Sequence, residues 1–219
     1  MKLQILSTSV VVLAKQHNPT ILHPAFLKSE SIVPSDWELS EPPVSTPVFA
    51  VVKYKNGIVF NVDETKLQVT QNQPTDDITQ SQPATLTCKY VQKLPHVKYL
   101  AVGINFQVFI ECANPEKFVM DRFLKPGIAD FEGTHLEASG LRFVYSLPST
   151  RLRISLDSGK VNPPNNAKQR SGILIDANYH MDLPGENTNE EIEEATSLHA
   201  HHYTHFVNVT HSILGLEDL

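Results

Sequence analysis

Apolar and polar residues alternate along several stretches of the chain with the two-residue period of a β-strand. Leu152, Ile154 and Leu156 alternate with polar residues, which predicts a strand with one buried face and one polar face. The Asn56-Gly57 pair favours a tight turn, because both residues tolerate positive φ. Further β-rich runs cover residues 3–13, 48–54, 58–62, 66–70, 99–111, 141–147, 151–156 and 173–181.

Helical spacing of apolar residues marks four other segments. These are residues 19–28, 83–94, 115–124 and 188–214. Pro83 stands where the first turn of a helix tolerates proline. Thr188 and Glu191 have the spacing of a capping box, which predicts that one continuous helix begins there and ends near Leu214.

The second half of the chain repeats the first in the order of its predicted elements, which is strand, helix, three strands and helix. Asn18-Pro19 followed by Phe26-Leu27-Lys28 is matched by Asn114-Pro115 followed by Phe123-Leu124-Lys125. No flexible linker separates the units, 1–97 and 98–219. We therefore expect one compact α+β domain in which two β-α-β-β-β-α pseudo-repeats share a curved antiparallel sheet with helices on one face. The competing architecture is a single long helix packed against one sheet.

This element order resembles the duplicated, saddle-shaped TATA-binding-protein-like fold, which implies a curved sheet with its longer helices on one face. The segments 90–97 and 101–106 also resemble an uncharacterised family of bacterial proteins with no assigned activity. That second resemblance implies a bacterial protein and supplies no catalytic residues.

Composition narrows the function classes. The 219 residues are 41% hydrophobic and 19% charged, as in ordinary globular proteins, and no apolar stretch is long enough to span a membrane. The net charge of -6 disfavours a general nucleic-acid binder, although binding of nucleic acid through a local basic patch remains an alternative. Cys88 and Cys112 form no CxxC motif, so we expect reduced thiols and a cytoplasmic protein.

The final predicted helix is rich in histidine. His201 and His205 are four residues apart and share a helix face with Glu194, which makes these three residues candidate zinc ligands. The alternatives are a core-facing stripe that includes His202 and Phe206, with the other imidazoles in solvent, and a pH-sensitive interface. We expect no cofactor unless this zinc site forms.

Two groups of polar residues are candidate binding residues. Asp176 and Asn178 alternate with apolar neighbours and share one face of a strand, while Arg142, Arg151 and Arg153 lie on the predicted hairpin 141–156. Each group either faces solvent or contacts a ligand, and the arginines would suit an anionic partner.

The sequence contains no Gly-x-Ser-x-Gly nucleophile elbow and no phosphate-binding loop, so we expect a protein that is not an enzyme. The leading hypothesis is an interaction or assembly subunit of a bacterial cytoplasmic system, with a protein partner or self-association. The alternative is a small-ligand or nucleic-acid binding module that uses the concave sheet face. A metal-dependent hydrolase is the third hypothesis.

Overall fold

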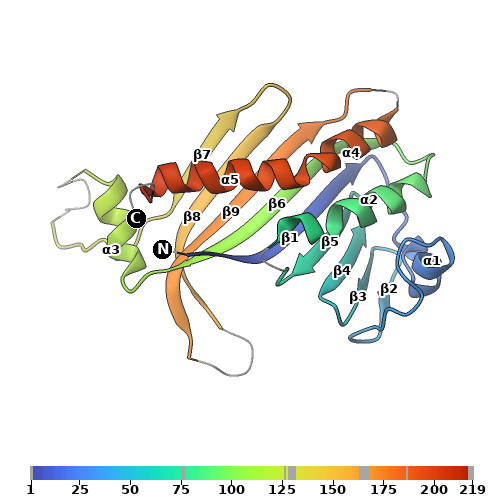
Figure 1. The fold of residues 1–219 in the computed structure, drawn as a ribbon, viewed down its shortest axis with the longest axis horizontal. Coiled ribbons are helices and arrows are strands. Elements are labelled where there is room, and N and C mark those ends of the chain that lie inside the picture. Colours follow the sequence, from blue (N-terminus) through green and yellow to red (C-terminus); the bar gives the residue numbers. More distant parts are fainter. Residues whose placement is uncertain are drawn as a thin grey trace.

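A computed structural model describes residues 2–74, 77–125, 127, 132–162, 168–185 and 187–216. It contains one nine-stranded antiparallel sheet with the longer helices on one face (Figure 1). The expected α+β class and shared antiparallel sheet are therefore confirmed. Within the part of the chain that the structure describes, no helix is long and apolar enough to cross a bilayer.

The first pseudo-repeat runs from β1 to α2. Its elements are β1 (Leu3–Ala14), α1 (Pro24–Ser29), β2 (Val44–Ser45), β3 (Phe49–Lys53), β4 (Ile58–Asp63), β5 (Lys66–Asn72) and α2 (Pro83–Gln92), with short 3-10 helices at Pro19–Ile21 and Ile78–Gln80. The hairpin predicted around Asn56-Gly57 joins β3 and β4, and Gly57 has a φ of 84°.

The second pseudo-repeat runs from β6 to the last helix. Its elements are β6 (Tyr99–Glu111), α3 (Pro115–Phe123), β7 (Leu141–Ser146), β8 (Arg151–Val161), β9 (Arg170–Asp182), α4 (Thr188–Ser197) and α5 (His199–Leu214). The predicted hairpin 141–156 is formed by β7 and β8, although β8 continues to Val161.

The sheet has the strand order β2-β3-β4-β5-β1-β6-β9-β8-β7. The first strand of each pseudo-repeat lies at the centre, where β1 and β6 pair along their length with Val10 opposite Ile104. From this central pair the remaining strands of each unit follow outwards in reverse sequence order. The two units therefore form one continuous sheet.

Alternation along the strands separates two faces of this sheet. Val10 and Val12 of β1, with Ile104 and Phe106 of β6, are buried on the face covered by helices. Burying each such side chain contributes about 1.5–3 kcal/mol relative to leaving it exposed. The residues between them point to the opposite face, which we call the open face.

The C-terminal helix differs from its prediction, because it is broken. α4 ends at Ser197 and α5 begins at His199, since the Leu198 backbone leaves helical geometry with ψ at 3°. The predicted capping box is also wrong. Thr188 lies inside α4, and the Glu191 carboxylate accepts from the backbone N–H of Gly185 at 3.2 Å.

Candidate functional site

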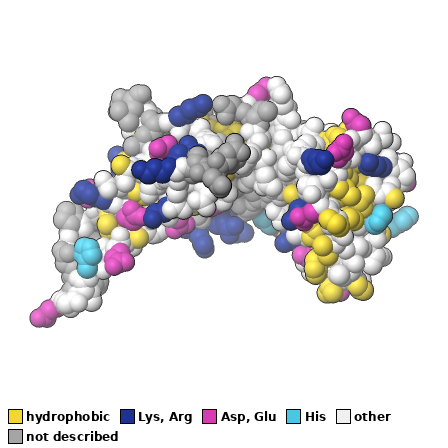
Figure 2. All heavy atoms as spheres, turned by 90° about the horizontal axis from the view of Figure 1, so that it is seen from below, with side chains coloured by type: hydrophobic (Ala, Val, Ile, Leu, Met, Phe, Trp, Pro, Cys, Tyr) yellow, Lys and Arg dark blue, Asp and Glu magenta, His cyan; other side chains and the backbone are white. Residues whose placement is uncertain are grey.

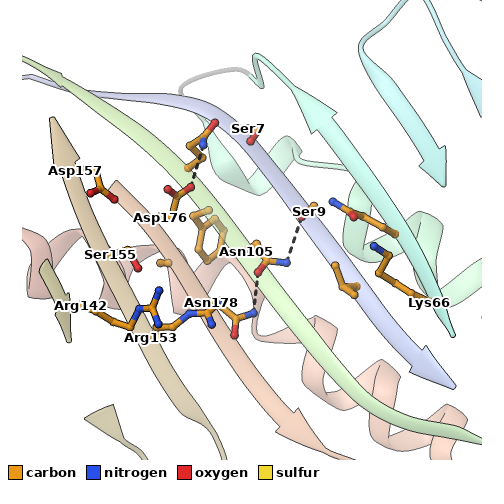
Figure 3. Close-up of a pocket in the computed structure, with 15 residues that line it drawn as sticks. Ser7, Ser9, Lys66, Asn105, Arg142, Arg153, Ser155, Asp157, Asp176 and Asn178 are labelled. Carbon is orange, nitrogen blue, oxygen red and sulfur yellow. Dashed lines mark hydrogen bonds between the residues drawn. The ribbon is translucent and has the colours of Figure 1, made fainter. Parts of the chain in front are cut away.

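The open face of the sheet contains a cavity of about 630 Å³ (Figure 3). Figure 2 shows the molecule as an arch with Lys and Arg side chains on the underside of its middle part. The polar residues that line the cavity come from β1, β5, β6, β7, β8 and β9. They are Ser7, Ser9, Lys66, Gln68, Asn105, Gln107, Arg142, Arg153, Ser155, Asp157, Asp176 and Asn178.

A row of hydrogen-bonded side chains crosses the centre of this cavity. The Nδ2 of Asn178 donates to Oδ1 of Asn105 at 2.7 Å, and the Nδ2 of Asn105 donates to Oγ of Ser9 at 3.3 Å. The row follows from the strand register, because Asn105 lies opposite both Ser9 and Asn178. Within the described part of the chain, the side-chain carbonyl oxygen of Asn178 and the hydroxyl hydrogen of Ser9 have no partner in this row, so both can bond a ligand.

Gly103 makes room for this row. A Cβ at that position would lie 3.1 Å from the Nδ2 of Asn178, which is tighter than most van der Waals contacts. The glycine therefore lets Asn178 lie flat across β6 and reach Asn105.

Charged residues surround Ser155 of β8 on the same face. Ser155 lies opposite Arg142 on β7 and opposite Asp176 on β9, while Arg153 and Asp157 are its nearest same-face neighbours along β8. Among the described residues, no ion pair involves either arginine or either aspartate of this group. We call these five residues the Ser155 cross.

One member of the Ser155 cross has a fixed orientation. The Oδ1 of Asp176 accepts a hydrogen bond from Nε2 of Gln107 at 3.0 Å, and among the described residues no donor is bonded to its second carboxylate oxygen. A third cation, Lys66, lines the opposite side of the cavity, on β5.

The structure brings together four of the five predicted binding residues. Arg142, Arg153, Asp176 and Asn178 all line the cavity, whereas Arg151 lies further along the same face of β8, opposite His180 and outside the lining. Sequence reasoning missed the other lining residues, which include Ser9, Asn105, Ser155 and Asp157. A polar residue within an otherwise apolar strand, such as Asn105 in the run 99–111, is the sequence signal that could have identified these lining residues.

The other face of the sheet holds the histidines of α5. The Nε2 of His199 lies 2.8 Å from Oγ1 of Thr8, whose hydroxyl donates to the backbone oxygen of Asn105 at 3.1 Å. Because that hydroxyl has only one hydrogen, which it donates to Asn105, Nε2 of His199 carries a hydrogen and donates it to Thr8. Burial, and then the nearby His202, lowers the pKa of His199 to about 4.

His202 and His205 both contact Tyr179. The His202 ring stacks on the Tyr179 ring at 4.1 Å with 17° between the planes, and Nδ1 of His205 lies 2.7 Å from the Tyr179 hydroxyl oxygen. Burial, followed by the charges of the neighbouring histidines, lowers the pKa of His202 to about 4. The predicted core-facing stripe thus includes His202 and Phe206, as expected, and also His199.

The predicted zinc ligands are not gathered into a cluster. Glu194 is exposed on α4, whereas His201 and His205 lie on α5 beyond the break at Leu198. Among the residues that the structure describes, no three His, Cys, Asp or Glu side chains are placed to hold one metal ion. The break at Leu198 separates Glu194 from the helix that carries His201 and His205.

Comparison with known proteins gives no match to a protein-family model, to a curated protein or to a solved structure.

Proposed function

We propose that this protein is a non-enzymatic binding protein whose ligand is small, polar and charged and lies in the cavity of the open face. One observation carries the proposal. Arg142 and Arg153 have no carboxylate partner within the described ranges. Arg153 lies opposite Asn178, at one end of the row formed by Ser9, Asn105 and Asn178, and Arg142 lines the same cavity from the next strand. A ligand in this place gains charge-assisted and neutral hydrogen bonds from groups that are already oriented.

Nucleic acid fits this surface less well. Proteins that hold single strands use exposed aromatic rings for stacking, but Phe106 is the one aromatic residue in the described cavity lining, and it is 1% exposed. The net charge of -6 also opposes a phosphate backbone. The polar lining also distinguishes this cavity from the mostly apolar pockets that bind drug-like molecules.

The test is a titration of isotope-labelled protein, followed through its backbone amide NMR signals. We expect glutarate, a small dicarboxylate, to shift amides of β6, β8 and β9, and we expect a short oligothymidylate to shift them less. Arg153→Ala should weaken the glutarate response about tenfold, the worth of one charge-assisted hydrogen bond.

Arg151→Ala is the matched control, because Arg151 has the same strand, face and exposure but lies outside the cavity lining. This variant should bind glutarate as the wild type does. Equal losses in the two variants, or shifts confined to the helical face, would contradict the proposed site.

Assembly through one end of the sheet is a second candidate function. Val44, Val48 and Phe49 near the β2–β3 turn are 41%, 60% and 44% exposed, and Figure 2 shows hydrophobic side chains gathered on one lobe of the molecule. Clustered apolar residues of this kind mark interaction surfaces. Light scattering should give a mass that rises with concentration and falls with Phe49→Ser but not with Val144→Ser. A constant monomer mass would reject self-association.

The proposed setting is the cytoplasm of a bacterium. Cys88 and Cys112 are both free thiols, which supports a reducing compartment. The bacterial origin rests on the sequence resemblance alone.

A further inference from the structure

We propose that the ligand of the open face is zwitterionic, with an anionic group held by Arg142 and Arg153 and a cationic group held by Asp157 and Asp176. This inference rests on the proposed function and specifies its ligand. It comes from the Ser155 cross, in which the two arginines flank one side of Ser155 and the two aspartates flank the other (Figure 3).

The spacing of the cross sets the length of the ligand. Arg142 and Asp176 flank β8 on neighbouring strands, so their Cα atoms are about 10 Å apart, and Arg153 and Asp157 are about 13 Å apart along β8. Side chains shorten the gap that a ligand must bridge. A chain of about three residues, whose extended length is about 10 Å, can place one charge at each end.

The cross also discriminates against ligands with one charge. A ligand with one charge occupies one end of the cross and leaves the two charged residues at the other end without a partner. A ligand with both charges matches both ends.

Neutral groups beside the charged ones suit a peptide backbone. The hydroxyl of Ser155, at the centre of the cross, can donate and accept, and the side-chain carbonyl oxygen of Asn178, which lies opposite Arg153 on β9, can accept from a peptide N–H. Because Asn178 donates to Asn105, its carbonyl oxygen is held in place before the ligand arrives. The class of ligand that fits is therefore a short peptide with both termini free.

Three probes test this assignment by NMR titration of the full chain. Triglycine has both charges, N-acetyl-triglycine has only the carboxylate, and triglycinamide has only the ammonium group. We expect triglycine to bind about tenfold more tightly than either blocked peptide, which corresponds to about 1.4 kcal/mol for the missing charge.

Two exposed substitutions should separate the ends of the site. Arg153→Gln is expected to weaken triglycine and N-acetyl-triglycine but not triglycinamide, whereas Asp157→Asn is expected to weaken triglycine and triglycinamide but not N-acetyl-triglycine. Arg151→Gln serves as the control and should change none of the three affinities. Asn is close in shape to Asp, and Asp157 is exposed, so unchanged amide spectra will show that this variant is folded.

The outcomes distinguish the inference from the proposed function. If N-acetyl-triglycine and glutarate bind as tightly as triglycine, the open face is a simple anion site, and the zwitterionic assignment is overturned while the proposed function stands. If no probe shifts the amides of β6, β8 and β9, both proposals fail.

Discussion

Acidification is expected to weaken the fold at His199, which joins α5 to the central strand β1 through a buried hydrogen bond. In the unfolded chain this imidazole takes a proton near its ordinary pKa of 6.5, but in the folded protein its pKa is lowered to about 4 because the side chain is 5% exposed. The unfolded state therefore binds more protons in this range. The stabilisation is complete above pH 6.5 and is lost as the pH falls towards 4.

The two pKa values set the magnitude of the loss. At pH 5 the linkage relation predicts that His199 alone lowers the free energy of unfolding by about 2 kcal/mol. Below pH 4 this decrease approaches about 3.4 kcal/mol. His202, with a pKa also lowered to about 4, adds to the effect in the same direction. For a domain with a typical total stability of about 5–15 kcal/mol, this is a large fraction.

Urea unfolding monitored by circular dichroism at pH 7.5, 6.5, 5.5 and 5.0 measures the effect. His199→Gln retains an N–H that can donate to Thr8 but takes up no proton, so its stability should fall less between pH 6.5 and 5.0 than that of the wild type. His96→Gln is the control, because the same substitution there removes an exposed imidazole instead of a buried one. If the wild type and His199→Gln lose stability in parallel, the buried imidazole does not cause the acid sensitivity.

Three further predictions concern the α5 region. Phe206→Ala should lower the free energy of unfolding, measured in urea, by about 3–5 kcal/mol, because Phe206 is 0% exposed. Val144→Ala is the control and should lower it by less than about 0.5 kcal/mol, because Val144 is 59% exposed. Similar decreases in the two variants would contradict the burial of Phe206 in the core. Gly215→Ala should lower stability by about 1 kcal/mol or more, because Gly215 ends α5 with a φ of 63°, and an unchanged midpoint would contradict the strain. Zinc should leave the melting temperature unchanged in the wild type and in a His201→Ala, His205→Ala double variant, and a rise in the wild type alone would restore the metal hypothesis.

Much of the sheet follows from local sequence patterns. The apolar run 99–111 predicts β6 with the bounds found in the structure. The expected order of strand, helix, strands and helix is found in both halves, although the first half has an additional short strand, β2. These predictions succeed because strand and helix periods are local properties that each segment carries independently.

The cavity was harder to predict because it depends on strand register. Asn105 contacts Ser9 and Asn178 only because β6 lies between β1 and β9, and residues so far apart in sequence give no local signal of contact. Arg151 and Arg153 both occupy polar, open-face positions of β8 in the sequence. Only the positions of the neighbouring strands decide that Arg153 lines the cavity and Arg151 does not. The break at Leu198 was missed because its flanking residues all tolerate a helix.

The pairing of β1 with β6 has a consequence for how the chain folds. Thr8 and Asn105, joined by a hydrogen bond, are 97 positions apart, so the middle of the sheet closes only after nearly half of the chain is in place. Until then one edge of β1 presents unpaired backbone groups, which are a template for pairing with other chains. A fragment ending near residue 97 would keep that edge exposed permanently and should aggregate, even though it contains every strand of its own unit.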